Sequence, residues 1–199
     1  KQDYEAAEAT FRERYEVCKK LYGYEHLNTA DALQDIAAVL QYKGDLASAE
    51  KHFREVLLVL QKVGASEHYY AVSPHLNLGV LLCNKEEFQE GENKIRQAIG
   101  ISGAIYGFES PMMAGAQSQL AECLTAMGRH EEAERELLKS YRLVETNPDY
   151  ARTTVYILEK IVAFYLTWDA AEPGKGYAEK AAEWRVKLDE LGTKAPRHE

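Results

Sequence analysis

Apolar and small residues recur along this chain at intervals of 42 positions. A short segment that ends in glutamate returns four times in register, as Tyr4–Glu8, Leu46–Glu50, Phe88–Glu92 and His130–Glu134. The same interval aligns Ile36, Leu78, Leu120 and Val162; Ala37, Gly79, Ala121 and Ala163; and Leu40, Leu82, Leu124 and Leu166. Several columns that agree at one spacing indicate an internal repeat.

Each copy predicts two antiparallel helices joined by a tight turn. A small residue is followed four positions later by a large apolar one, which is the spacing of neighbours on one helix face. These pairs are Ala7 and Phe11, Ala49 and Phe53, Gly91 and Ile95, and Ala133 and Leu137. Gly44 and Gly128 mark the ends of first helices, because glycine readily adopts a left-handed C-terminal conformation, and Glu86 replaces them in the middle copy. Helices this short become stable when neighbouring pairs stack.

The repeat columns resemble the tetratricopeptide repeat, in the 42-residue variant of kinesin light chains and of many bacterial signalling proteins. In one copy the consensus positions are occupied by Leu33, Ile36, Ala37, Leu40, Gly44, Leu46, Ala49 and Phe53. The resemblance covers about residues 4–143 and implies an all-α, tetratricopeptide-like superhelix of antiparallel helix pairs, an alpha solenoid. The chain departs from the family at His75 and Gln117, where a large apolar residue is preferred.

Pro74 falls inside what should be a first helix. Proline fits the first turn of a helix but kinks its interior. We expect this helix to start late, with Ser73 as its cap, and a kink at Pro74 is the alternative.

We expect one helical-repeat domain over residues 1–192, followed by a frayed tail over 193–199. The domain would comprise a second-helix half repeat over 4–26, repeats over about 27–66, 67–108 and 109–146, and an irregular terminal pair over 149–191. The frame places a missing first helix before Lys1, so we expect a chain cut from a longer protein or a nonstandard helix that covers this end. The segment Ala181–Arg185 also resembles the last repeat of some bacterial kinases and regulators.

Composition and charge exclude several classes of function. Among the 199 residues, 32 acids against 24 bases give a formal charge of −8, which repels duplex nucleic acid and anionic membranes. No apolar stretch reaches the roughly 20 residues that a membrane-spanning helix needs. The three cysteines are odd in number and lie far apart, which favours reduced thiols and a cytoplasmic location. We therefore expect neither a nucleic-acid nor a membrane partner.

The sequence carries no motif of known chemistry. It lacks a glycine-rich phosphate loop, the common zinc-binding spacings and a nucleophile elbow. Glutamates recur in every copy at Glu8, Glu50, Glu92 and Glu134, and we interpret them as rim positions with helix-dipole or intrahelical pairing value. We expect no enzyme, no cofactor and no metal, and an enzyme of unrecognised type is the alternative.

The resemblance implies that the first helix of each pair lines a concave groove. Carrying the family's groove positions along the 42-residue frame selects mostly polar or small residues, among them Gln34, Asp35, Asn77, Gln119 and Glu122. Because an amide offers donors and an acceptor to an extended peptide, Asn77 and Gln119 are the leading candidates. In the last pair the frame adds one cation and two aromatic anchors, Lys160, Phe164 and Trp168. Alternatively, these aromatic residues cap the core of the array.

We expect a noncatalytic interaction module that binds a protein or peptide in this groove. Co-chaperones of the family clamp an acidic peptide terminus with basic residues, but here the corresponding positions mostly hold Gln34, Ala38, Gly115 and Gln119. With Asp31, Asp35 and Glu122 expected to face inward, a neutral or basic peptide is favoured over an acidic one.

The alternative function is that of a regulatory or structural segment of a larger signalling protein, for example a bacterial kinase. Its contacts would then be intramolecular, or would join copies through the open N-terminal repeat, where Tyr4, Phe11 and Tyr15 leave an apolar face that needs cover.

Overall fold

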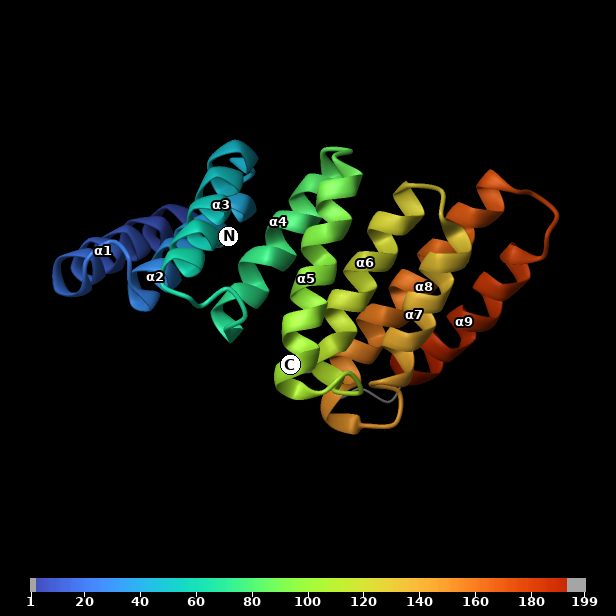
Figure 1. Ribbon diagram of the computed structural model, residues 1–199. Coiled ribbons are helices and arrows are strands. Elements are labelled where there is room, and N and C mark those ends of the chain that lie inside the picture. The colour runs from blue at the N-terminus through green and yellow to red at the C-terminus, as the bar shows by residue number, and fades with distance from the viewer. Residues whose placement is uncertain (1–2, 193–199) are drawn as a thin grey trace. The chain divides into compact units, whose positions relative to one another are not determined.

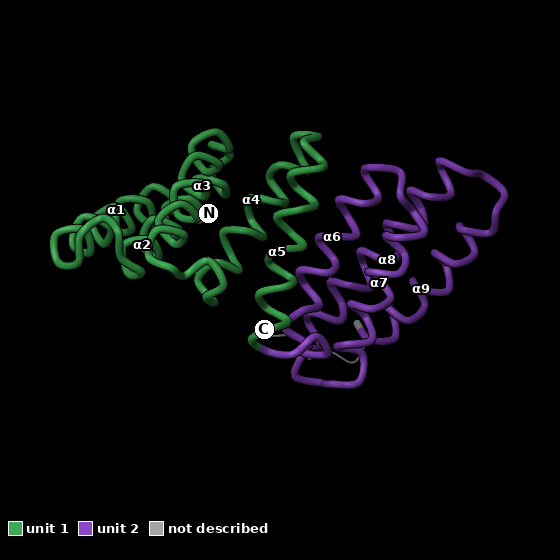
Figure 2. The backbone as a smooth tube through the Cα atoms, viewed as in Figure 1, with its two compact units in different colours: residues 1–105 green, residues 106–199 purple. Residues whose placement is uncertain are grey.

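The computed structural model describes residues 3–192, and strands are absent from that range. The chain divides into two compact units, residues 1–105 and residues 106–199, which are described separately (Figures 1 and 2). The frayed tail expected over 193–199 lies outside the described residues. The expected all-α class is confirmed.

Unit 1 consists of a half repeat followed by two helix pairs. Its helices are α1 (Tyr4–Tyr22), α2 (Leu27–Lys43), α3 (Leu46–Lys62), α4 (Val72–Asn84) and α5 (Phe88–Tyr106), of which α5 ends one residue past the unit boundary. A short 3₁₀ turn, η1 (Tyr69–Ala71), leads into α4. Helix α2 packs on both α1 and α3, and α3 packs on α4. The expected alternation of first and second helices is confirmed.

Unit 2 consists of two further pairs. It contains η2 (Pro111–Met113), α6 (Ala114–Ala126), α7 (His130–Arg142), η3 (Pro148–Tyr150), α8 (Ala151–Ala171) and α9 (Tyr177–Gly192). Helix α6 packs on α7, α8 packs on α9, and the two first helices α6 and α8 also contact each other.

The repeat columns form the core of unit 1. Ile36, Phe53 and Leu78 are completely buried in one apolar cluster. In the second pair, a Cβ added at Gly79 would lie 2.6 Å from Cγ1 of Ile95 and 2.8 Å from the carbonyl oxygen of Gly91. The recurrent small residue is therefore needed because the backbones of α4 and α5 approach closely.

The turns within the pairs confirm the predicted role of glycine. Gly44 has a φ of 86° and Gly128 a φ of 74°, both in the left-handed region. Glu86, which replaces glycine in the middle copy, adopts the same region with a φ of 65°. A side chain is disfavoured there, so this turn holds backbone strain that its counterparts lack.

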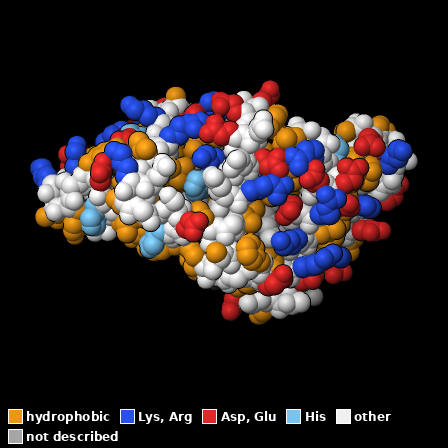
Figure 3. Space-filling model, in the orientation of Figure 1, with side chains coloured by type: hydrophobic (Ala, Val, Ile, Leu, Met, Phe, Trp, Pro, Cys, Tyr) orange, Lys and Arg blue, Asp and Glu red, His pale blue; other side chains and the backbone are white. Residues whose placement is uncertain are grey.

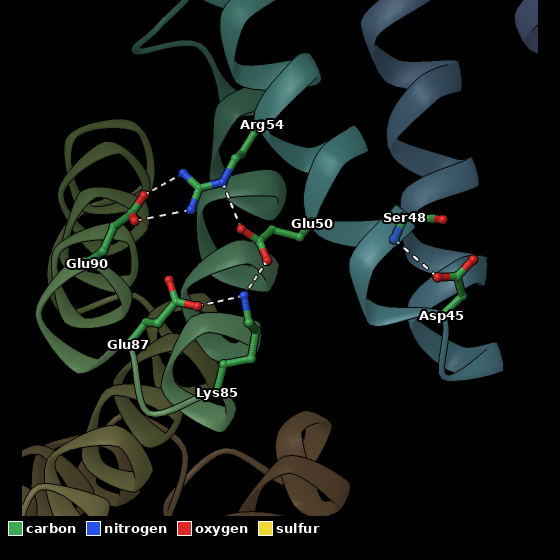
Figure 4. A network of polar contacts seen from close by, with 7 residues as sticks. All are labelled: Asp45, Ser48, Glu50, Arg54, Lys85, Glu87 and Glu90. Carbon is green, nitrogen blue, oxygen red and sulfur yellow. Dashed lines mark hydrogen bonds and ion pairs between the residues drawn. The ribbon is translucent and has the colours of Figure 1, made fainter.

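The recurrent glutamate Glu50 links two successive helix pairs (Figure 4). The carboxylate of Glu50 accepts hydrogen bonds from Arg54 Nε at 3.0 Å, within α3, and from Lys85 Nζ at 2.8 Å, just past the end of α4. The bond from Lys85 lowers the pKa of Glu50 despite its partial burial. Arg54 also donates two hydrogen bonds to Glu90 on α5, at 2.6 and 3.1 Å.

Glu8 makes the same pair of contacts one copy earlier. Its carboxylate binds Arg12 Nε at 2.8 Å and Lys43 Nζ at 2.6 Å. The predicted intrahelical pairing is confirmed at both positions, and the bond to the lysine at the end of the next first helix is an additional finding.

The late start of the first helix at Pro74 is confirmed, but the predicted cap is wrong. Helix α4 begins at Val72, so Pro74 lies in its first turn and Ser73 lies inside the helix. The preceding turn η1 is capped instead by His68, whose Nδ1 accepts a hydrogen bond from the backbone amide of Tyr70 at 3.4 Å. The turn brings the chain into helical geometry before Ser73 is reached.

The 42-residue frame slips by one residue in the last pair. It predicts that Ala163 and Leu166 are buried like their counterparts, but Ala163 is exposed and Leu166 is 48% exposed. A step of 41 residues instead aligns Leu120 with Ile161 and Leu124 with Tyr165, and all four are buried. The alignment of Ala163 and Leu166 with the core columns is therefore wrong.

The expectation of three free thiols is also wrong. Cys18 is free, whereas Cys83 and Cys123 are disulfide-bonded, so the cysteines do not support a reducing compartment. Among the described helices, none combines the length and apolar character that crossing a bilayer requires.

Candidate functional site: polar side chains of the first helices

The first helices of unit 2 share a polar cluster formed by Gln119, Glu122, Tyr156 and Lys160, which we name the α6–α8 cluster. Gln119 Nε2 on α6 donates a hydrogen bond to the Tyr156 hydroxyl on α8 at 2.8 Å. Lys160 Nζ on α8 lies 2.8 Å from Glu122 Oε1 on α6, and 5.2 Å from the centre of the Tyr156 ring. The structure therefore brings together three of the predicted groove residues.

The charges in this cluster stabilise one another. Partial burial disfavours the ammonium form of Lys160, but the bond to Glu122, the charge of Glu122 and the contact with Tyr156 together outweigh that effect and raise the pKa of Lys160. Burial and the nearby Glu122 carboxylate raise the pKa of Tyr156. Near neutral pH the cluster thus presents an ion pair, a neutral phenol and an amide.

The predicted groove residues of unit 1 lie on α2 and α4. Gln34 and Asp35 are half-buried on α2, and Asn77 is half-buried on α4. Asp35 shares the guanidinium of Arg14 on α1 with Asp31, and burial raises the pKa of Asp35 although Arg14 opposes the shift. The inward acids of this unit therefore already have a cationic partner.

Phe164 and Trp168 lie in the interior of unit 2 and not on its surface. The Trp168 ring stacks on Tyr177 with centroids 4.0 Å apart, and its indole nitrogen donates to Glu172 at 3.0 Å. Phe164 packs against Trp168, with ring centroids 5.4 Å apart, and both residues are buried. They offer no anchoring surface, and they correspond to the alternative in which aromatic residues cap the core.

Two residues of the polar face were not predicted. Tyr156 was not predicted to lie on the polar face, because the 42-residue frame places it in a core column. The 41-residue step instead aligns it with Asp31 and Gly115. The same step aligns Lys160 with Asp35, Asn77 and Gln119, and Phe164 with the buried Val39, Leu81 and Cys123. Arg14 gave no signal, because its contacts cross from α1 to α2.

No group of three or more histidines, cysteines or carboxylates among residues 3–192 is arranged to hold a metal ion. On the face of the molecule seen in Figure 3, acidic and basic side chains are interspersed instead of gathered into one patch of a single sign.

Residues 1–62 match the model of the tetratricopeptide repeat family. The fold is similar to a crystal structure of a variant of a putative kinesin light chain with nearly identical TPR-like repeats from Podosopora anserina, with a TM-score of 0.76 and 17% identity, covering 96% of this chain and 87% of that one. A second structure of that protein gives a TM-score of 0.74 and 18% identity, covering 98% and 90%.

BtubC (BKLC) from P. vanneervenii is also similar, with a TM-score of 0.78 and 13% identity, covering 100% of this chain and 78% of that one. No curated protein matches the sequence. The family match confirms the expected tetratricopeptide repeats over residues 1–62, and the similar structures confirm the solenoid class of helix pairs.

Proposed function

We propose that this protein is a noncatalytic interaction module whose first helices bind a peptide or partner protein. Tetratricopeptide repeats generally serve protein–protein interaction, and the observation that carries the proposal here is the α6–α8 cluster. Its side chains come from two successive first helices, so one extended ligand could contact both.

The cluster suits recognition of a peptide backbone. Gln119 uses one N–H on Tyr156, which leaves its second N–H and its carbonyl oxygen for a ligand within the described part of the chain. Hydrogen bonds of this kind contribute roughly 0.5 to 1.5 kcal/mol each. In unit 1, Asn77, Asp35 and Gln34 are the corresponding candidates.

A neutral or basic peptide is the proposed ligand. Two acids of unit 1, Asp31 and Asp35, share one guanidinium, that of Arg14, which leaves an excess of negative charge in this group of three side chains. In unit 2, Lys160 neutralises Glu122. The preference for basic peptides should therefore be modest and should weaken with salt.

A library of short peptides, measured by fluorescence anisotropy at two salt concentrations, tests the proposal. Peptides with lysine or arginine should bind more tightly than acidic ones, and Gln119→Ala should weaken binding by about three- to tenfold. Gln89→Ala, which alters an exposed glutamine on the second helix α5, is the matched control. Equal binding of acidic peptides, or equal losses in both variants, would contradict the proposal.

A second candidate function is self-association through α1, as part of a larger signalling protein. A groove of about 560 Å³ lies between α1 and α2, lined by Tyr4, Ala7 and Phe11 on one side and by Ala38, Val39 and Tyr42 on the other. The counterparts of Phe11 in later second helices, Phe53, Ile95 and Leu137, are buried, whereas Phe11 is partly exposed.

Sedimentation across a range of concentrations tests this second candidate. Tyr42 is 74% exposed, so Tyr42→Glu should abolish association without unfolding the chain. Leu21→Glu, at an exposed apolar residue on α1 outside this groove, is the control and should leave association unchanged. A monomer at every concentration would exclude self-association.

A further inference from the structure

Unit 1 contains a cavity of about 450 Å³ between α3, α4 and α5 that includes none of the proposed peptide-binding side chains. Its apolar walls include Leu57 and Leu78, and its polar lining includes Ser66, His75, Lys94 and Gln97. A cavity of roughly 150 Å³ already accommodates benzene in a protein core, so this one has room for a substituted ring.

The preceding copy of the repeat shows which side chains occupy the equivalent space. The residues that line the cavity have counterparts 42 positions earlier in the sequence. In the same order, the counterparts of Leu57, Ser66, His75, Lys94 and Gln97 are Tyr15, Tyr24, Leu33, His52 and Glu55. At that earlier position, the Tyr24 and Tyr15 rings pack against the apolar core of unit 1. The Tyr24 hydroxyl donates a hydrogen bond to Glu55 Oε1 at 2.7 Å, and His52 Nδ1 lies 3.2 Å from the other oxygen. A phenol ring therefore fills the equivalent space one copy earlier.

The second copy has lost the phenol and changed the charge around it. Ser66 in place of Tyr24 removes the ring, and Leu57 in place of Tyr15 removes another. Gln97 in place of Glu55 deletes a negative charge, while Lys94 in place of His52 adds a positive one. The result is an open cavity where the earlier copy has a ring, together with a net gain of positive charge.

Within the described residues, two polar groups in this cavity make no direct ion pair or hydrogen bond, although the charge of Lys94 also helps to lower the pKa of Glu90. Within residues 3–192, Lys94 makes no ion pair, and the buried Nδ1 of His75 makes no hydrogen bond. Burial and the neighbouring Lys94 lower the pKa of His75 to about 4, so its ring is neutral near pH 7 and can donate one hydrogen bond. Arg54 also lines the cavity, but its guanidinium is already bound by Glu50 and Glu90.

We propose that this cavity binds a small aromatic acid. The ring takes the place that Tyr24 fills in the preceding copy, and the carboxylate pairs with Lys94 and accepts a hydrogen bond from His75. A hydroxyl group on the ring, where present, hydrogen-bonds to Gln97, as the Tyr24 hydroxyl does to Glu55. A tyrosine side chain of a partner peptide lacks the carboxylate and leaves Lys94 unpaired, which is why the ligand is a free acid.

Calorimetric titration with 4-hydroxyphenylacetate tests the proposal, with the imidazole NMR signals of His75 as the site-specific readout. The wild-type chain should bind saturably and shift those signals. Ser66→Tyr restores the side chain that fills the earlier copy and should abolish binding, while Lys94→Gln should weaken it by about tenfold. Lys51→Gln removes an exposed lysine outside the cavity and should leave binding unchanged.

Three results would overturn the proposal. One is the absence of binding at millimolar concentrations of 4-hydroxyphenylacetate. Another is that the Ser66→Tyr and Lys94→Gln proteins both bind the acid as tightly as the wild type does, which would place the acid elsewhere. The third is equal affinity for N-acetyltyrosinamide, since that probe has the phenol without the carboxylate. Because Lys94 is only half-buried on α5, Lys94→Gln keeps the test decisive if Ser66→Tyr fails to fold.

Discussion

Two stretches of unit 1, residues 24–63 and 66–105, follow the same 42-residue repeat, yet they have different residues at several matched positions. Both contain a helix pair with the same buried columns, and the carboxylate bonds of Glu8 are repeated at Glu50. Among the matched positions at which they differ are Tyr24 and Ser66, Leu33 and His75, Ala37 and Gly79, and Gly44 and Glu86. The frame thus keeps its core while neighbouring positions change enough to open a cavity, bury a histidine and strain a turn.

The largest change in stability is expected when Tyr24 in the first stretch is replaced by serine, the residue that the second stretch has at the matched position, Ser66. Tyr24→Ser removes a packed ring and the hydrogen bond to Glu55, and should lower the free energy of unfolding by about 3 kcal/mol. Urea denaturation measures this change. Tyr24→Phe, which keeps the ring, should lose only about 1 kcal/mol, and similar losses in the two variants would show that the ring is not packed.

The next effect concerns the close contact between α4 and α5. Gly79→Ala places a Cβ against both the backbone and Ile95, and should destabilise unit 1 by about 2 kcal/mol. Gly100→Ala is a control in a helix with open space around the added carbon and should be neutral or stabilising. Equal denaturation midpoints for the two variants would contradict the close approach.

A smaller effect, dependent on pH, is expected at His75. Because burial lowers its folded-state pKa to about 4 from the ordinary 6.5, protonation favours the unfolded chain, and stability is lost as the pH falls from about 6.5 toward 4. His75→Leu, which restores the residue type of Leu33, should remove this loss, about 1 kcal/mol at pH 5 after solvent screening. Thermal melts at pH 7 and pH 5 measure it, and the same pH dependence in both proteins would exclude His75 as its source.

The smallest effect is expected at the strained turn. Glu86→Gly gives the second stretch the residue that the first has at Gly44, and should stabilise the chain by about 0.5 kcal/mol because glycine adopts a positive φ readily. Glu87→Gly, one residue later, should not stabilise. A lower melting temperature for Glu86→Gly would show that the side chain offsets the strain.

The helix pairs were predictable because each buried column has a residue in every copy at constant spacing, and Ile36, Leu78 and Leu120 are all buried. The register of α8 was not, because Ile161 and Val162 are both apolar and fit either a 41- or a 42-residue step. Only the packing decides between them, and it buries Tyr165 while it exposes Leu166.

The polar face was predictable in part. Gln119, Glu122 and Lys160 lie together on the two first helices, although Lys160 aligns with Gln119 by the 41-residue step. The contact of Arg14 with Asp31 and Asp35 could not be predicted, since it joins side chains of different helices and has no counterpart in later copies. The cavity between α3, α4 and α5 could not be predicted, because its cause, the replacement of Tyr24 by Ser66, is recognised only once the structure shows where Tyr24 lies.

The carboxylate of Glu50 binds two cations, and this arrangement has a consequence for how the number of repeats changes in evolution. Its two cations lie four and 35 positions ahead, so duplicating any 42 consecutive residues in unit 1 would recreate both bonds at the new junction. A protein whose neighbours are joined in this way can gain or lose a whole copy by unequal recombination without leaving a charge unpaired at the seam.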